Sequence, residues 1–525
     1  MRTPALITTA ELALLLFSGR GALVAQAPPP LPDTTGWGVH VLAVAQDPEG
    51  DLWVGTYGRG ILRLRHGTSA WEQVRRDSSG TSISFDFVHA FAFGPRGQIW
   101  YGTVGNGWGV SLDGGHTWKN WTYDQLGPEW QYVTPDGIAT RGDTTVVATA
   151  DGLQITTDDG SHWVAIVDRS GPPARGPADS ALPLLENEYV RRLFSDREGW
   201  ILSTLRGTEG LRRKGASWSV DRQGNMSLPP GNTVVIGGKT YRGTPCGLRP
   251  ASERTPCLTG DAPAAEPPRS PLTAWLRRPI AREDNWYIDQ TYRYGSTMGG
   301  TFQQHQGVEF NNPDGTPVHA VLAGVVVHSG PAEQGALTVT LRHDTTVTAD
   351  GTTYRLYSTY YHNSALEVKV GDRVKAGQVL ARVGNTGRAT NDHLHLELSA
   401  SPTDSLGAIV DSTQRFPPYT TNAELWLQPL PGTGIVAGQV FDAAGMPVRQ
   451  ARIHGLVKPE PAETPFSFAE TYGERGHSHP LYGEHFALSD VPAGTYVVGT
   501  EIGGRKILRR VTVEPGKLTW VVFRP

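Results

Sequence analysis

His393-Leu394-His395-Leu396-Glu397-Leu398 is the stretch that decides the fold in the middle of this chain. Polar and apolar residues alternate strictly along it, and this period of two is typical of a half-buried β-strand. His393 and His395 therefore point to one face, while the leucines point to the other face and enter the core. Two histidines on one face of a strand are candidate ligands of a metal ion.

A second fragment upstream, His305-Gln306-Gly307-Val308-Glu309, offers the same chemistry. Zinc binds imidazole nitrogen and carboxylate oxygen, and a catalytic zinc has three protein ligands and one open position for water. His305, Glu309 and His395 are the candidate ligands of such a Zn²⁺ ion. His362, which follows two tyrosines, and His393 are then expected beside the water.

The first fragment cannot be a straight strand, because His305 and Glu309 would then lie roughly 13 Å apart. The chain must curl between them, and Gly307 is expected to supply an unusual backbone angle. A helix is disfavoured because the turn cluster Asn311-Asn312-Pro313-Asp314-Gly315 follows. We therefore expect the ligands on a loop and a strand of a β-rich domain.

Several short motifs in the same order extend this pattern. Gly315-Thr316-Pro317-Val318-His319-Ala320 follows the first fragment, and Tyr361-His362, Gly371-Asp372-Arg373-Val374 and Gly384-Asn385-Thr386-Gly387 precede the second. Residues 302–398 thereby resemble the lysostaphin/LytM-type zinc metallopeptidases, which cut peptide cross-links of bacterial peptidoglycan. The resemblance implies a zinc endopeptidase with His305, Glu309 and His395 on the metal and His362 and His393 as catalytic residues. The family usually has Asp where this chain has Glu309.

Other interpretations of these residues stay open at this point. A catalytically silent scaffold that binds cell wall or protein would keep the same fold, and Glu309 favours that alternative. The segment from Gly371 to Val379 also resembles the hairpin of lipoyl or biotinyl carriers around a modified lysine, here Lys375. His319, His328 and His343 are interpreted as ordinary strand or surface residues.

Residues 28–260 contain a repeat typical of propeller blades. Trp53-Val54-Gly55-Thr56 and Trp100-Tyr101-Gly102-Thr103 each end a strand–turn–strand unit, and weaker copies follow at 133–151 and 190–204. Their spacing lies in the range of propeller repeats, and four or five blades fit. Ser111–Trp118 resembles an Asp-box, and Thr157–Trp163 is a degenerate second copy. We interpret both as structural turns in which the Asp caps the turn and the Trp packs into the blade.

The remainder of the chain divides into a linker and two domains. Residues 261–274, rich in Pro and Ala, are expected to be a linker, and residues 275–428 form the predicted peptidase domain. Residues 432–525 resemble the small β-sandwich that is appended to some carboxypeptidases. Three histidines, His477, His479 and His485, are expected in a solvated loop of this domain, with a metal site as the alternative. The predicted fold class is thus mainly all-β and multidomain.

Composition and the N-terminus suggest where the protein works. The net charge is only −4 over 525 residues, so nothing favours nucleic acid or an anionic membrane as a partner. Residues 1–27 are predicted to be a signal peptide, with a cytosolic start as the alternative. We therefore expect an extracytoplasmic protein, periplasmic or secreted, without stable membrane insertion. Cys246 and Cys257 form one disulfide there or remain free thiols. Peptidoglycan peptides or a protein are the expected substrates, and a propeller ligand is not identified.

Overall fold

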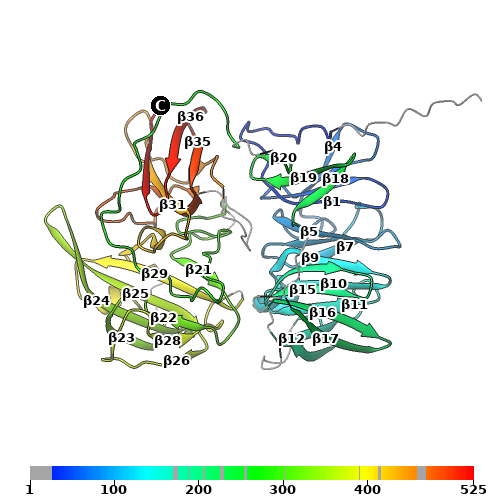
Figure 1. Ribbon diagram of the computed structural model, residues 1–525, viewed down its shortest axis with the longest axis horizontal. Helices are drawn as coiled ribbons and strands as arrows, with labels where there is room; N and C mark the ends of the chain where they lie inside the picture. The colour runs from blue at the N-terminus through cyan, green and yellow to red at the C-terminus, as the bar shows by residue number, and fades with distance from the viewer. Residues whose placement is uncertain are drawn as a thin grey trace, which may run out of the picture.

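The structure is a computed structural model and describes residues 27–168, 176–186, 189–204, 207–224, 230–253, 257–298, 300, 302–389, 391–411, 416–457 and 469–525. Within these residues nearly all regular structure is β, and α1 (Tyr123–Trp130) is the only α-helix. This confirms the predicted mainly-β, multidomain fold (Figure 1). The proposed signal peptide lies outside the described residues, except for its last residue. No helix in the described part is long and apolar enough to cross a membrane.

Five β-sheets follow one another between residues 41 and 250, and their strands are antiparallel apart from one parallel pair in the third sheet. Their strands are β1 (Val41–Gln46), β2 (Leu52–Thr56), β3 (Ile61–Leu64) and β4 (Trp71–Val74); β5 (Val88–Phe93), β6 (Ile99–Thr103), β7 (Trp108–Ser111) and β8 (Lys119–Trp121); β9 (Val133–Arg141), β10 (Thr144–Thr149), β11 (Gly152–Thr156), β12 (Val164–Asp168) and the parallel β13 (Ser180–Leu185); β14 (Val190–Ser195), β15 (Trp200–Thr204), β16 (Gly207–Lys214) and β17 (Ser217–Gly224); and β18 (Thr233–Ile236), β19 (Lys239–Thr244) and β20 (Gly247–Pro250). The fifth sheet contacts the first, where Asn232 Nδ2 donates to the carbonyl of Val41 over 3.3 Å.

The repeated Gly-Thr has a physical reason in these sheets. A Cβ on Gly55 would lie 2.3 Å from the carbonyl oxygen of Val88, so only glycine lets the next sheet approach this closely. The threonine that ends the second strand donates its hydroxyl to a glycine carbonyl across the following turn. This bond recurs in all five sheets: Thr56 to Gly60, Thr103 to Gly107, Thr149 to Gly152, Thr204 to Gly207 and Thr244 to Gly247.

Both Asp-boxes are turn caps, as predicted. Asp113 accepts from the backbone N–H groups of His116 and Thr117 over 3.1 and 2.9 Å, and Trp118 is buried. Asp158 does the same for Ser161 and His162. Cys246 and Cys257 are joined by a disulfide, which resolves the two alternatives for this pair.

A larger sheet forms the core of the middle region. Its order is β21 (Val308–Asn311), β29 (His393–Ser401), β25 (Thr352–Asn363), β24 (Leu337–Ala349), β23 (Gly324–Pro331) and β27 (Arg373–Val374), with β30 (Thr420–Thr421) beside β29. A small second sheet contains β22 (Pro317–His319), β28 (Val379–Arg382) and β26 (Ala365–Leu366). Leu394, Leu396 and Leu398 are fully buried in the core between them, as the alternation predicted.

The C-terminal region is a small sandwich. One sheet contains β34 (Phe486–Pro492), β31 (Thr433–Val440) and β37 (Leu518–Phe523), and it packs on the hairpin of β35 (Gly494–Ile502) and β36 (Arg505–Val513) and on the pair β32 (Arg452–Ile453) and β33 (Ala469–Glu470). The segment expected to be a linker lies along this sandwich. Ala265 and Arg269 donate backbone hydrogen bonds to Arg510 and Leu518, in β36 and β37.

The segment before β21, described over residues 275–298, 300 and 302, connects the three regions to one another. Arg278 forms a buried ion pair with Asp490 of the sandwich, and Arg293 forms another with Glu424 in the short 3₁₀ turn Ala423–Leu425. On the propeller side, the rings of Phe302 and Phe85 lie 6.1 Å apart. In Figure 1 the propeller-like sheets form one half of the molecule, and the middle region and the sandwich form the other.

Candidate metal centre

Pairing of β21 with β29 brings the two sequence fragments together. Glu309 lies opposite His395 and Asn311 lies opposite His393 in the antiparallel register. His305 lies in the loop before β21, where its backbone N–H donates to Ser296 and its carbonyl accepts from Gly295. His305 thus lies on a loop and His395 on a strand, as expected, whereas Glu309 lies on the second strand, β21, and not on the loop.

Gly307 has a role that differs from the one predicted. Its φ lies outside the left-handed range, so it supplies no unusual backbone angle. A Cβ at this position would instead lie 2.5 Å from the carbonyl oxygen of Leu396 and 2.7 Å from Nε2 of His395. The residue must be glycine because the loop passes directly against β29 and its histidine.

Three donor atoms meet in a small triangle. His305 Nε2 lies 3.0 Å from Glu309 Oε1 and 3.3 Å from His395 Nδ1, and the third edge, from His395 Nδ1 to Glu309 Oε1, is 3.8 Å. A tetrahedral zinc ion with ligand bonds of about 2.0–2.1 Å needs donors about 3.3–3.4 Å apart. The triangle fits that requirement, and its two imidazoles and one carboxylate are a donor set that zinc accepts.

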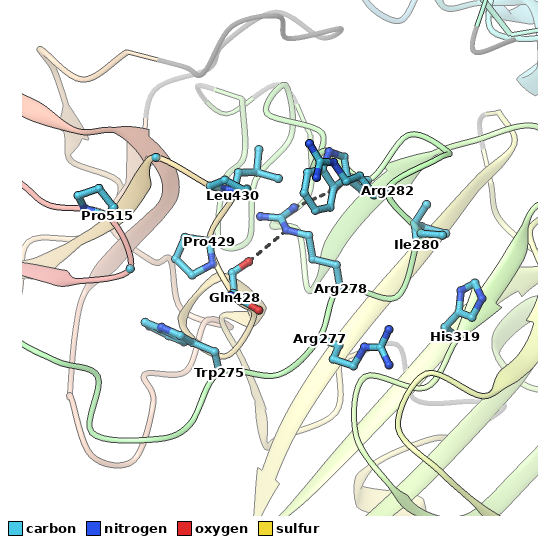
Figure 2. A pocket seen from close by; sticks show the side chains of 15 residues that line it. Trp275, Arg277, Arg278, Ile280, Arg282, His319, Gln428, Pro429, Leu430 and Pro515 are labelled. Carbon is cyan, nitrogen blue, oxygen red and sulfur yellow. Dashed lines mark hydrogen bonds between the residues drawn. The ribbon is translucent and has the colours of Figure 1, made fainter.

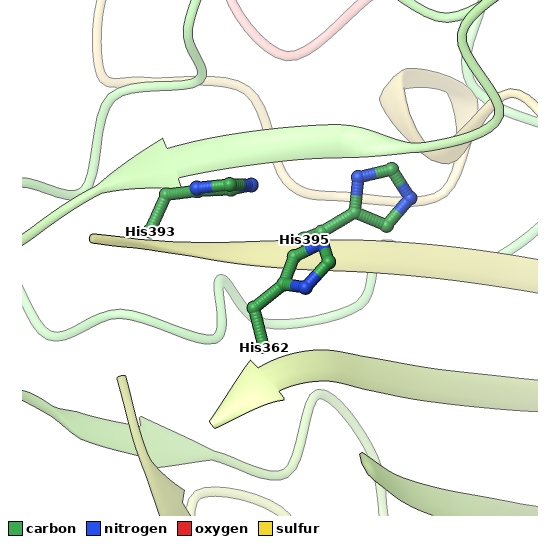
Figure 3. A group of neighbouring side chains, drawn as sticks. All are labelled: His362, His393 and His395. Carbon is green, nitrogen blue, oxygen red and sulfur yellow. The ribbon is translucent and has the colours of Figure 1, made fainter. Parts of the chain in front are cut away.

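His362 and His393 lie beside His395, which is one corner of this triangle (Figure 3). Nδ1 of His362 is 2.9 Å from the carbonyl of Thr386, and Nδ1 of His393 is 2.8 Å from the carbonyl of Asn391. Because a carbonyl only accepts, each Nδ1 carries a proton, and Nε2 is the nitrogen that can exchange a proton within the site. Nε2 of His393 lies 3.6 Å from Glu309 Oε1. Together with His395 these histidines form a second possible ligand group, with donor atoms within 4.8 Å.

The charges in the site are strongly coupled. Burial alone would raise the pKa of Glu309, but His393 and His305 outweigh it and hold that pKa well below its usual range. Burial opposes a charge on His395 too, yet hydrogen bonds with Glu309 and Glu397 raise its pKa to about 9. Burial and the neighbouring His393 and His395 lower the pKa of His362. A single carboxylate among four imidazoles thus stays ionised and able to bind a cation.

Two residues of the site have no role in the sequence prediction. The ring of Tyr292 stacks on His305 with centroids 4.3 Å apart and planes 14° apart. Glu397 is buried, and its Oε1 lies 3.4 Å from Nε2 of His395. The alternation of the strand carried a signal for Glu397, because it shares a face with His393 and His395. Tyr292 lies 13 positions before His305 by residue number, in a segment without regular structure, and no sequence pattern indicated it.

The remaining histidines lie outside this site. His319, His328 and His343 lie on β22, β23 and β24, and His343 is buried between Ala323 and Ser358. Lys375 is exposed at a turn. Among the described residues, the two groups that could bind a metal ion both lie at this centre.

The expectation of a solvated histidine loop is wrong for His479. Its side chain is fully buried, and its ring packs 4.1 Å from Trp426 and 4.5 Å from Tyr482. His485 is partly buried, with Nδ1 beside Val440 of β31. The loop packs into the junction between the middle region and the sandwich, because these rings fill apolar space there.

Comparisons with known proteins agree with the geometry. Residues 303–405 match the model of peptidase family M23, and residues 36–58 match the two component regulator propeller. The chain is 36% identical over 107 residues to the glycyl-glycine endopeptidase ALE-1 of Staphylococcus capitis, covering 20% of this chain and 28% of that one. It is 35% identical over 127 residues to the peptidoglycan DD-endopeptidase ShyA of Vibrio cholerae, covering 24% and 27%.

A solved structure is also similar to part of the chain. The catalytic domain of lysostaphin from Staphylococcus simulans is 34% identical, with 22% of this chain and 78% of that chain covered and a TM-score of 0.17. The chain spans less than a third of the length of the two curated relatives named above, so the likeness concerns the metallopeptidase domain alone.

Proposed function

We propose that this chain, which carries a metallopeptidase domain of family M23, is an extracytoplasmic zinc endopeptidase that hydrolyses the cross-link peptides of peptidoglycan. The observation that carries the proposal is the triangle of His305 Nε2, Glu309 Oε1 and His395 Nδ1, whose edges of 3.0–3.8 Å suit one tetrahedral ion. The donor atoms of His362, His393 and His395 also lie within 4.8 Å of one another, but that group contains no carboxylate to offset the charge of the ion. We therefore assign Zn²⁺ to the first group.

The chemistry follows from how the side chains are held. Zinc bound here would polarise the scissile carbonyl and lower the pKa of a coordinated water. His362 and His393 have their Nδ1 protons engaged by carbonyl groups, so each offers the Nε2 lone pair to a proton on the attacking water. Once protonated, the same nitrogen donates a hydrogen bond to the developing oxyanion or a proton to the leaving amine. Tyr292 and Glu397 hold the two ligand imidazoles in place.

The substrate class rests on the relatives. ShyA is named a peptidoglycan DD-endopeptidase and ALE-1 a glycyl-glycine endopeptidase, so both names describe endopeptidases and one of them specifies peptidoglycan. The disulfide between Cys246 and Cys257 supports a location in an oxidising compartment, outside the cytoplasm. Because these names describe different bonds, the scissile bond is left to experiment.

The test combines metal analysis with digestion of purified peptidoglycan. The full chain is expected to contain one zinc per molecule and to release soluble muropeptides, and a chelator should abolish the release until zinc is restored. His362→Ala should retain the zinc and lose most of the turnover, whereas His328→Ala, on β23 outside the site, should match the parent. Full zinc occupancy without hydrolysis of any peptidoglycan type would instead favour a silent, wall-binding scaffold, the alternative that Glu309 supports.

A further inference from the structure

A cavity of about 570 Å³ lies at the junction between the middle region and the sandwich (Figure 2). Trp275, Arg277, Arg278, Arg282, Trp286 and Leu430 are among the residues that line it, and none of the metal-centre residues does. Its volume lies within the range of small-ligand sites, about 300–1,000 Å³.

Arg278 is a fixed part of the cavity wall. Its Nε donates to the carbonyl of Gln428 over 3.1 Å and its Nη1 to the carbonyl of Trp286 over 2.7 Å. Its Nη2 donates to both carboxylate oxygens of Asp490 over 2.5 and 2.6 Å. The charge of Arg278 is therefore neutralised, and its donors are used within the protein.

Arg277 and Arg282 are in a different situation. Both are exposed, and neither forms an ion pair or a side-chain hydrogen bond within the described part of the chain. The guanidinium of Arg282 lies over the ring of Trp286 at 5.6 Å, a contact that leaves its N–H edges free. Figure 2 shows Arg277 and Arg282 on either side of Arg278.

The cavity is positive although the chain is not. No acidic residue is among the residues that line it, so two arginines without an ion pair contribute to one cavity wall in a protein of net charge −4. Trp275, Leu430 and neighbouring prolines add an apolar wall. Guanidinium groups match carboxylates in shape and charge, and they bind them through paired hydrogen bonds.

We propose that this cavity binds the free carboxylates of a short acidic peptide, with Arg277 and Arg282 as the recognising residues and the Trp275–Leu430 wall against the apolar side chains. The inference rests on the proposed function, because peptidoglycan supplies peptides of this chemistry. The cavity is then a second peptide-binding site. It holds one peptide of the peptidoglycan network while the metal centre hydrolyses another.

Binding is measured on the full chain after removal of metal by a chelator, so that no hydrolysis is required. Calorimetric titration uses acetyl-Ala-Glu-Ala, with two carboxylates, and acetyl-Ala-Gln-Ala amide, with none. The first peptide should bind and the second should bind at least about tenfold more weakly. Arg277→Gln and Arg282→Gln should each weaken the first by roughly tenfold, as expected for loss of a charged hydrogen-bond donor. Arg505→Gln, at the exposed first residue of β36, is the matched control and should change nothing.

Equal affinity for the two peptides, or unchanged affinity for the acidic peptide in both arginine variants, would overturn the inference. Inorganic phosphate that competes as effectively as the acidic peptide itself would also overturn it, because it would indicate a simple anion site. Failure of the proposed function looks different. In that case peptidoglycan would not be digested by the zinc-loaded protein, whereas carboxylate-dependent binding by the metal-free protein would still be observed.

Discussion

The phenol ring of Tyr292 lies parallel to the imidazole of His305, with centroids 4.3 Å apart, and it is the contact that fixes the plane of this proposed ligand. Metal-binding histidines usually donate their second N–H to a carboxylate or carbonyl. Nδ1 of His305 is buried without a hydrogen-bond partner in the described part of the chain. Stacking therefore does the positioning that a hydrogen bond does elsewhere.

Tyr292→Leu should accordingly weaken zinc binding by about tenfold. This is the lower end of the loss of metal affinity that follows mutation of a residue that orients a metal ligand. Tyr292→Phe keeps the stacked ring and should bind zinc as the parent does. Competition with a chromophoric chelator measures both affinities directly. Equal affinity in Tyr292→Leu would show that the loop backbone alone holds His305.

Glu309 is the residue whose replacement should affect the metal most. Glu309→Ala leaves two histidines in the triangle and should lose most of the bound zinc, because a carboxylate ligand and its charge are both removed. Glu309→Asp keeps the charge and should retain zinc and part of the activity. Atomic emission measures the zinc content of both variants. Full zinc occupancy in Glu309→Ala would exclude Glu309 from the ligand set.

Glu484 should make the stability of the protein fall as pH rises. Burial raises its pKa to about 8, although the backbone N–H of His479 and the hydroxyl of Tyr472 donate to it. Between its ordinary value of 4.5 and about 8 the folded protein holds a proton that the unfolded chain has released. The free energy of unfolding must then decrease across that interval.

Glu484→Gln removes this titration. Urea unfolding should show little difference from the parent near pH 5 and a relative gain on the order of a few kcal/mol near pH 8. Glu501→Gln, on the exposed side of β35, is the control and should follow the parent at both values. A difference that is the same at both pH values would mean that Glu484 does not titrate as inferred.

The ion pair of Arg278 and Asp490 should be important for holding the sandwich to the middle region. Their side chains are 5% and 1% exposed, and removing one partner leaves the other charge buried and unpaired. We expect Asp490→Asn to lower the free energy of unfolding by about 3 kcal/mol. Glu474→Gln breaks an exposed pair with Arg449 and should change it by less than about 1 kcal/mol. Denaturant unfolding followed by tryptophan fluorescence compares the two.

Local patterns account for much of what could be predicted. Alternation in 393–398 placed His393 and His395 on one face and three leucines in the core, because side chains on a strand alternate whatever its neighbours are. The Trp-x-Gly-Thr repeat indicated the blades, and the Asp-box turns followed from side chains that bond their own backbone. The reason predicted for Gly307, an unusual backbone angle, was wrong. A side chain there would clash with Leu396 and His395, which are far away in sequence.

The sequence by itself determined the strands, the chemistry of the five candidate residues and the resemblance that orders them, since these depend on residue type and short spacing. Only the tertiary structure decided that Glu309 pairs with His395, that Tyr292 stacks on His305, and that two unpaired arginines face one cavity. Those relationships join residues from separate segments, and the pairing of strands and the packing of side chains, rather than any local preference, bring them together.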